Sequence, residues 1–130
     1  MRYLLDTHAF MWFLSDDPKL SAIAKARIED STVSICISPA TYWEMAIKVG
    51  IDKLDLIEPF DRLLERGITG NGFEILPIAP AHAIRLTTLP RLRDHKDPFD
   101  RMLIAQALVE GIPLISCDVQ FDAYGITRIW

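Results

Sequence analysis

The chain alternates between two kinds of hydrophobic pattern along its length. Short apolar, β-branched runs typical of strands are separated by segments whose apolar residues recur every three or four positions, as in amphipathic helices. Strands that alternate with helices in this way favour an α/β fold with a mainly parallel sheet. The predicted strands cover residues 2–5, 32–37, 73–78, 113–116 and 127–130. The predicted helices cover residues 8–14, 21–29, 38–49, 59–66, 81–88 and 97–111.

Two of the predicted helices have clear start and stop signals. Ser38 and Asp97 can each accept a hydrogen bond from the first turn, and each precedes a proline, which suits the first helical position. Gly50 and Gly111 follow these helices and are typical of helix ends. No repeat, linker or low-complexity segment interrupts the chain, so we expect one domain over residues 1–130.

The composition indicates the class and the cellular compartment of the protein more than its activity. Half of the 130 residues are hydrophobic, which is enough to bury a core. A formal net charge of −4 argues against a protein that coats nucleic acid through bulk charge, although metal ions would cancel part of it. Cys36 and Cys117 lie in apolar runs without metal-ligand spacing, so we interpret both as buried residues in a reducing compartment. The chain has no apolar run of the ~20 residues that a membrane helix needs and no signal-peptide pattern, so we expect a cytoplasmic protein without membrane contact.

Acidic residues fall at the positions where a parallel sheet binds ligands. Asp6 and Asp118 follow the first and fourth predicted strands, and ligands bind outside the carboxyl ends of such strands. Asp100 lies in the first turn of the helix over residues 97–111, and Glu44 lies among apolar residues of the helix after the second strand. Converging carboxylates repel one another unless a cation lies between them, and Mg²⁺ and Mn²⁺ prefer such oxygen ligands.

Each of these acids, taken singly, also has a purely structural interpretation. Asp6 and Asp118 are ordinary turn or helix-cap residues by type and position. Asp100 suits the positive end of a helix, and Glu44 forms helix readily and can face solvent. The functional interpretation therefore depends on their joint placement and on the sequences around them.

Those surrounding sequences resemble the PIN-domain family, and within it the VapC-like toxins. The resemblance covers essentially the full length, and the third of its four motifs is the most specific. The motifs are Leu4–His8, Ser38–Glu44, His95–Ala107 and Leu114–Asp118. By this resemblance the four family acids are Asp6, Glu44, Asp100 and Asp118. The resemblance implies a three-layer α/β/α sandwich, metal-dependent RNA cleavage as the toxin of a type II toxin–antitoxin pair, a homodimer, and an antitoxin partner.

Hydrolysis of a phosphodiester fits acids of this kind. It needs an activated water and relief of charge on the phosphate, and one or two Mg²⁺ ions, or Mn²⁺ as a substitute, can supply both. We predict that Asp6, Asp100 and Asp118 are metal ligands, directly or through water. Glu44 is predicted either to bind a second metal or to orient the attacking water.

Several neighbouring polar residues keep two interpretations. Asp97 is either the cap of its helix or a fifth carboxylate near the metal. Thr7 and Ser116 have hydroxyls that can hold water or a carboxylate, or that can make ordinary turn hydrogen bonds. His8 and His82 lack metal-ligand spacing, so we interpret them as structural or surface residues.

A basic loop borders the predicted acidic site. Its side chains would position RNA phosphates beside the acids, or would form an ordinary solvated loop. The candidates for RNA contact are Arg91, Arg93, Lys96 and Arg101, with His95 in the same positive rim. Aromatic and methionine residues near the site are interpreted mainly as core, with some available for a dimer or antitoxin surface. These residues are Phe10, Met11, Trp12, Phe13, Trp43 and Met45.

Other classes of protein fit the sequence less well or remain open. A phosphate-transferring hydrolase on a similar sheet often carries a second aspartate two residues after the first, where this chain has His8. A dinucleotide-binding enzyme needs a glycine-rich turn after the first strand, and the chain has none. Two alternatives stay open: a non-catalytic module that binds RNA or protein, and a DNA nuclease that uses the same acids.

Overall fold

A five-stranded sheet forms the centre of the computed structural model, which describes residues 1–130, and every strand pair in it is parallel. The strand order is β3-β2-β1-β4-β5, so the first strand of the chain lies in the middle. The strands are β1 (Arg2–Leu5), β2 (Ser34–Ile37), β3 (Glu74–Ile75), β4 (Leu114–Ile115) and β5 (Arg128–Ile129). The helices are α1 (Thr7–Leu14), α2 (Ala22–Glu29), α3 (Pro39–Gly50), α4 (Phe60–Leu64), α5 (Pro80–Leu86) and α6 (Pro98–Glu110). Two short turns complete the list, the π-helical η1 (Glu65–Thr69) and the 3-10 helical η2 (Val119–Tyr124).

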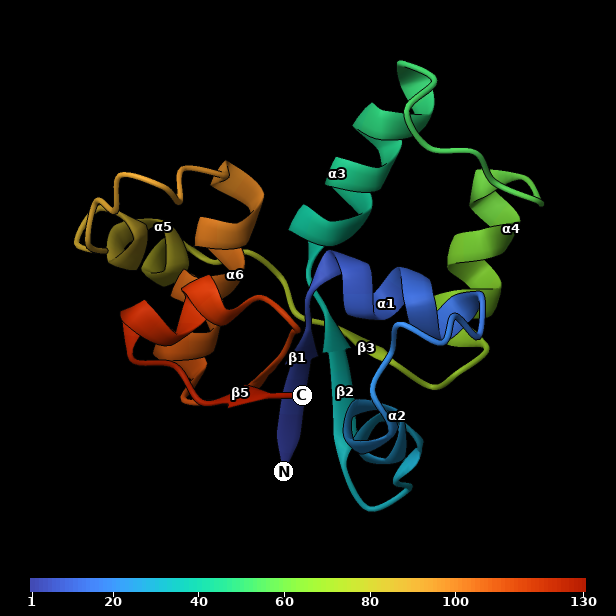
Figure 1. The fold of residues 1–130 in the computed structure, drawn as a ribbon, viewed down its shortest axis with the longest axis horizontal. Coiled ribbons are helices and arrows are strands. Elements are labelled where there is room, and N and C mark those ends of the chain that lie inside the picture. Colours follow the sequence, from blue (N-terminus) through green and yellow to red (C-terminus); the bar gives the residue numbers. More distant parts are fainter.

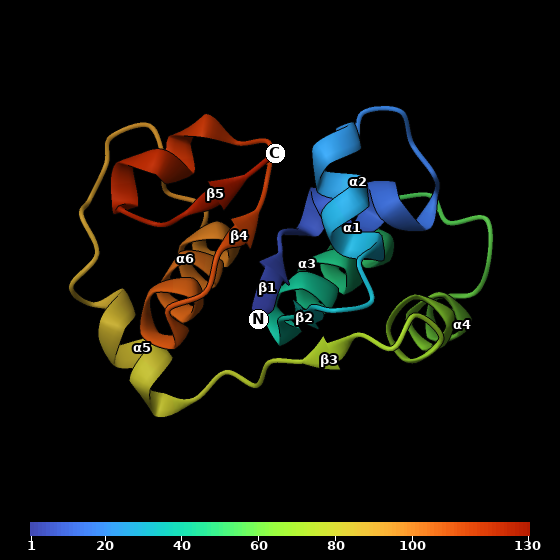
Figure 2. The same cartoon turned by 90° about the horizontal axis from the view of Figure 1, so that it is seen from below.

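The sheet is the middle layer of three. In Figures 1 and 2, α1, α2 and α4 lie on one side of it, and α5, α6 and the C-terminal turn η2 lie on the other. Side chains of β1 point alternately to the two faces of the sheet. Tyr3 and Leu5 pack into the core with α1 and α2, whereas Leu4 packs into the core with α6. The predicted α/β fold with a parallel sheet and three layers is confirmed.

The predicted helix signals are confirmed at Ser38, Asp97 and Gly111, and Asp97 caps α6 as predicted. Ser38 Oγ accepts a hydrogen bond from Ala40 N at 3.1 Å at the start of α3. Gly111 ends α6 with φ of +64°, a conformation that few residues other than glycine adopt without strain. The end of α3 differs from the prediction, since the helix includes Gly50 and the positive φ falls at Asp52.

Several predicted elements are shorter in the structure, and for two of them the physical reason is clear. The strand predicted over residues 73–78 is reduced to β3, because its only partner, β2, ends at Ile37 and the chain enters α3. The helix predicted over residues 59–66 ends at Leu64 and continues as η1. Gly67 lies in η1, and a Cβ there would come within 2.8 Å of the Leu14 side chain, so a larger residue would require that side chain to move.

Two sequence interpretations are incomplete or wrong. Residues 119–124 were not assigned to any element, but they form η2, which buries Phe121 and Tyr124. Cys36 is buried as expected, whereas Cys117 is exposed, because it lies beyond the two-residue strand β4. The longest helix has 13 residues, and no helix has both the length and the apolar composition of a membrane span.

Candidate active site

The strand order creates a site at the carboxyl end of β1. Strand order reverses beside β1, because β2 and β4 lie on opposite sides of it, and open α/β sheets bind ligands at such switch points. Leu5 and Ile115 are register partners, and Asp6 N donates a hydrogen bond to the Ile115 carbonyl at 3.1 Å. Asp6 and Asp118 therefore leave the sheet at the same end, which is the end at which α1 and α3 begin in Figure 1.

Asp6 is a buried carboxylate that also caps a helix. Its Oδ1 accepts a hydrogen bond from Ala9 N at 2.7 Å, at the start of α1. Burial raises the pKa of Asp6 above its usual value, and the negative charge of Asp118 raises it further. The Ser116 hydroxyl, Ala9 N and the charge of His8 act in the opposite direction. The cap interpretation of Asp6 is thus correct, and the side chain still lies close enough to Asp118 to interact with its charge.

Asp100 has the most strongly perturbed carboxyl group of the site. Its pKa is raised from 3.8 to about 6, first by burial and then by the negative charge of Asp97. The charge of Asp6 adds a smaller increase, while a hydrogen bond to His95 lowers the value. Carboxyl groups with perturbed pKa values that lie beside other acids are common at functional sites.

Asp118 brings a third carboxylate to the same place. Its Oδ1 accepts from Gln120 N at 2.9 Å and so caps η2, while its backbone N donates to Ser116 Oγ at 3.0 Å. One ligand atom each from His95, Asp100 and Asp118 lie within 4.8 Å of one another. Two of the three predicted metal ligands, Asp100 and Asp118, therefore lie within reach of one cation, together with His95. Asp6, the third, is not part of this group, but its charge interacts with those of Asp100 and Asp118.

Glu44 lies on α3, and its charged neighbour is a lysine rather than another of the predicted site acids. It is buried, and its Oε2 pairs with Lys48 Nζ at 3.1 Å. Thr41, one turn earlier on α3, accepts a hydrogen bond of 3.4 Å from the Thr7 hydroxyl, which ties α3 to the residue after Asp6. The predicted solvent-facing alternative for Glu44 does not hold, because the residue is only 8% exposed.

Asp97 is an exposed helix cap in the structure. Its Oδ1 accepts hydrogen bonds from Phe99 N at 2.9 Å and from Asp100 N at 3.0 Å. Asp97 therefore acts as the helix cap, the first of its two interpretations. Its negative charge also raises the pKa of Asp100.

The basic loop forms a hollow next to the acids. Arg91, Arg93 and Lys96 are exposed, and together with Leu92, His95 and Arg101 they line a space of about 310 Å³. Arg101 is partly buried, and its Nη1 donates to the carbonyl of Pro90 at 2.8 Å. Three of the four predicted RNA-contact residues are thus free to meet a substrate, and the fourth is held by the loop itself.

His95 does not belong to the exposed positive rim in which the sequence analysis placed it. It is 5% exposed, its Nδ1 lies 2.8 Å from the Tyr124 hydroxyl, and its Nε2 lies 3.2 Å from Asp100 Oδ2. Neither contact has a signal in the sequence, because nothing near position 124 indicates a partner in the loop.

The other two histidines have the roles expected of them. His8 is exposed and its ring lies 5.4 Å from that of Trp12. His82 is buried, and its Nδ1 accepts a hydrogen bond from Ala79 N at 2.9 Å.

The residues of the site fit a hard divalent cation. Asp6, Asp100 and Asp118 supply carboxylate oxygens, the donors that Mg²⁺ and Mn²⁺ prefer. Asp6 is buried and Asp100 is half-buried, and both have raised pKa values, which means that the folded protein alone does not fully stabilise their charges. A cation between these acids would provide the missing stabilisation.

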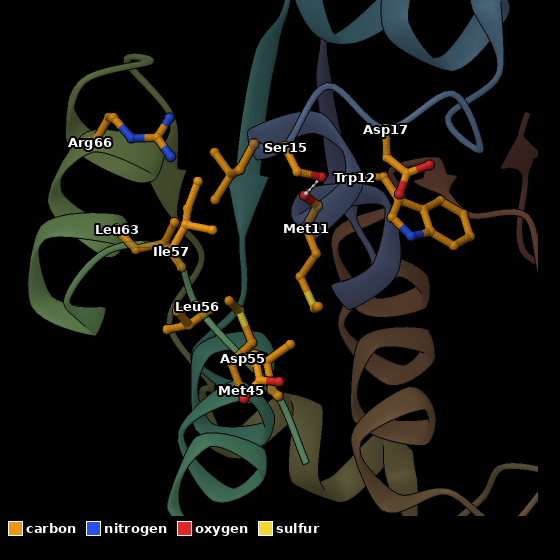
Figure 3. Close-up of a pocket in the computed structure, with 12 residues that line it drawn as sticks. Met11, Trp12, Ser15, Asp17, Met45, Asp55, Leu56, Ile57, Leu63 and Arg66 are labelled. Atoms are coloured by element: carbon orange, nitrogen blue, oxygen red, sulfur yellow. Dashed lines mark hydrogen bonds between the residues drawn. The ribbon is translucent and has the colours of Figure 1, made fainter. Parts of the chain in front are cut away.

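A separate apolar pocket lies away from these acids. Figure 3 shows Met11, Trp12 and Met45 among the residues that line it, together with Leu56 and Ile57. The pocket measures about 270 Å³, and none of the site acids lines it. Three of the aromatic and methionine residues that the sequence analysis assigned mainly to the core therefore also border a surface pocket.

Comparison with protein families identifies the class to which the chain belongs. The model of the PIN domain matches residues 3–126, so the chain belongs to the PIN-domain family. This match confirms the resemblance found in the sequence. No curated protein matches the chain.

Solved structures share this fold at low sequence identity. One is a crystal structure of DNA-bound VapBC from Salmonella typhimurium, whose matching chain is 21% identical, with a TM-score of 0.72 over 98% of this chain and 96% of that chain. Another is VapBC2 from Rickettsia felis bound to a promoter DNA fragment, with 16% identity and a TM-score of 0.71 over 98% and 97% of the two chains. A toxin–antitoxin complex from Klebsiella pneumoniae gives 24% identity and a TM-score of 0.62 over 93% and 90%.

Proposed function

We propose that this PIN-domain protein is a metal-dependent endoribonuclease and the toxin of a type II toxin–antitoxin pair. The observation that carries the proposal is the pair Asp100 and Asp118, whose ligand atoms lie within 4.8 Å at the switch point of the sheet, with the pKa of Asp100 raised to about 6. The buried Asp6 interacts with both through its charge. Acids gathered in this way lower the stability of a protein, and a function that requires them explains their presence. The similarity in fold to chains of toxin–antitoxin complexes supports the proposal.

The three aspartates would hold Mg²⁺, or Mn²⁺ in its place. Bound there, the cation would lower the pKa of a coordinated water and offset charge on the scissile phosphate. Ala9 N fixes the orientation of the Asp6 carboxylate, and the Ser116 hydroxyl stabilises its charge. Glu44 would extend the acidic set from α3, where it either holds a second cation or orients the attacking water.

RNA is the substrate that we propose, and the basic hollow supports a nucleic acid at this position. Arg91, Arg93 and Lys96 are exposed beside the acids, so they can contact phosphates on either side of the bond to be cleaved. The choice of RNA over DNA follows from the resemblance to VapC-like toxins, and it is tested directly below.

An antitoxin protein is the proposed partner, and the homodimer remains an expectation. The apolar pocket of Figure 3 supports a protein partner, since exposed apolar surface of this kind is often covered in complexes. Ile57, which lines this pocket, is 99% exposed. Similar chains in solved structures belong to toxin–antitoxin complexes.

The decisive experiment compares the wild type with Asp6→Asn. Asparagine can accept the hydrogen bond from Ala9 N and so retains the cap of α1, while it removes the carboxylate. We expect the variant to fold but to lose Mg²⁺- or Mn²⁺-dependent RNA cleavage. Asp30→Asn is a matched control, because Asp30 also accepts a backbone hydrogen bond, from Thr32 N at 2.9 Å, but is exposed and far from the cluster in the fold.

The substrates and the metal are varied in the same assay. Single-stranded RNA, single-stranded DNA and duplex DNA are compared with Mg²⁺, with Mn²⁺ and with EDTA. If only DNA is cleaved, the protein is a DNA nuclease and the ribonuclease proposal is wrong. If RNA is bound but nothing is cleaved, the protein is a non-catalytic binding module. Equal RNA cleavage by the wild type and Asp6→Asn would refute the assigned site.

A further inference from the structure

A chain of hydrogen bonds connects the basic loop with Asp100. Arg101 Nη1 donates to the Tyr124 hydroxyl at 3.4 Å, and this hydroxyl lies 2.8 Å from Nδ1 of His95. The other ring nitrogen, His95 Nε2, lies 3.2 Å from Asp100 Oδ2. An ionised carboxylate can only accept, so His95 Nε2 donates to Asp100. In the neutral imidazole Nδ1 is then the acceptor, and the Tyr124 hydroxyl donates to it while accepting from Arg101. The donors of the chain therefore all point toward the acidic site.

The imidazole of His95 is fixed from two sides. Its ring centre lies 5.4 Å from that of Phe121 and 5.4 Å from that of Tyr124, and only 5% of the residue is exposed. Both aromatic residues belong to η2, and the residue that caps η2 is Asp118. One short turn thus carries Asp118 and also holds the histidine that contacts Asp100.

We propose that His95 is a positioning residue that holds the Asp100 carboxylate toward Asp118, with Tyr124 and Arg101 fixing its ring. Two neighbouring carboxylates repel each other, so Asp100 on its own would turn away from Asp118. The N–H of His95 Nε2 opposes that movement, and ligand atoms of His95, Asp100 and Asp118 stay within 4.8 Å of one another. His95 has this role only if the proposed function, metal-dependent cleavage, also holds.

The geometry favours positioning over the two other roles open to His95. Contact with RNA is disfavoured, because only 5% of His95 is exposed although the residue borders the basic hollow. Direct binding of the cation is disfavoured, since both ring nitrogens already have hydrogen-bond partners and Mg²⁺ prefers oxygen ligands.

Three variants of the full chain test the role of His95. His95→Phe keeps an aromatic ring for packing and removes both nitrogens, whereas His95→Gln keeps a side-chain N–H that can reach Asp100. Tyr124→Phe leaves the histidine in place but removes the hydroxyl that orients it. His82→Gln is the matched control, because His82 is equally buried but contacts Glu110 at the other end of α6.

Mn²⁺ binding without RNA is the first measurement, by electron paramagnetic resonance of the free ion. We expect His95→Phe to weaken binding about 10–100-fold, as is typical when a group that orients a metal ligand is lost. His95→Gln should recover part of the loss, Tyr124→Phe should lose less than His95→Phe, and His82→Gln should bind like the wild type. Thermal unfolding checks the fold of each variant, and if His95→Phe does not fold, Tyr124→Phe and His95→Gln decide the question.

RNA cleavage at saturating Mn²⁺ is the second measurement. A positioning residue should lower kcat with little change in KM for RNA, because it does not touch the substrate. Mn²⁺ affinity and kcat that are unchanged in all three variants would overturn the role of His95 and leave the ribonuclease proposal intact. A wild-type protein that neither binds Mn²⁺ nor cleaves RNA would instead overturn the proposed function, and the positioning role with it.

Discussion

Replacement of Asp100 by asparagine should stabilise the metal-free protein, although it removes an acid of the proposed site. The pKa of Asp100 is raised from 3.8 to about 6, chiefly because burial disfavours its charge. Each pKa unit corresponds to about 1.4 kcal/mol, so the ionised group costs the folded state at most about 3 kcal/mol. The side chain is 27% exposed, and solvent screening lowers the expected gain in the free energy of unfolding to about 1–2 kcal/mol. Asparagine can still accept the hydrogen bond from His95, so that contact is retained.

The pH dependence of this gain has a definite sign. Below about pH 4 the acid is protonated in both the folded and the unfolded chain, and the wild type and Asp100→Asn should be equally stable. As pH rises from about 4 to about 6, the unfolded chain loses its proton first, so the wild type loses stability relative to the variant. The difference is complete above about pH 7 and stays constant beyond it.

Urea and thermal denaturation in EDTA, followed by circular dichroism, measure the effect. We expect Asp100→Asn to raise the Tm by roughly 3–10 °C at neutral pH. Added Mn²⁺ should stabilise the wild type more than the variant, because ligand binding adds to the stability of the folded state alone. Asp94→Asn, an exposed aspartate of the same loop, serves as the control and should change little. Equal stability of Asp100→Asn and the wild type at every pH in EDTA would refute the argument from burial.

Two further predictions concern the neighbours of Asp100. Asp97→Ala should lower the free energy of unfolding by about 1 kcal/mol in urea denaturation, because it removes the cap of α6. Asp97→Asn should keep the cap and lower the pKa of Asp100, which a carbon-13 titration of the carboxyl group would detect. A pKa of Asp100 that does not fall in Asp97→Asn would contradict the role given to the charge of Asp97. Arg93→Gln and Lys96→Gln should each weaken RNA binding and reduce the slope of log K against log salt by about 0.7, the value for one phosphate contact on a single strand. Lys53→Gln changes an exposed lysine elsewhere and serves as the control. If the salt slopes of Arg93→Gln and Lys96→Gln equal that of the wild type, these side chains do not contact phosphates.

Features that depend on local chemistry could be predicted from the sequence. Ser38, Asp97 and Gly111 act within one helical turn of their own positions, so residue type and spacing were sufficient to place them. The site acids Asp6 and Asp118 follow strands, and parallel pairing then brings them to one end of the sheet. Their convergence required only the correct fold class.

Features that depend on distant packing could not be predicted. His95 appeared as one more basic residue of a loop, and it is buried because η2, about thirty residues later, folds over it. The length of β3 was set by where its partner β2 ends, and Cys117 is exposed because β4 is only two residues long. In each case a contact made elsewhere in the chain outweighed the local pattern.

The position of β1 in the middle of the sheet has a consequence for the timing of activity. β1 is synthesised before its neighbour β4, from which β2, β3 and all the α-helices separate it, and Asp118 follows β4. A growing chain therefore carries Asp6 before it has the residues that complete the acidic cluster. If the protein is the proposed nuclease, we expect a chain that stops before Asp118 not to cleave RNA.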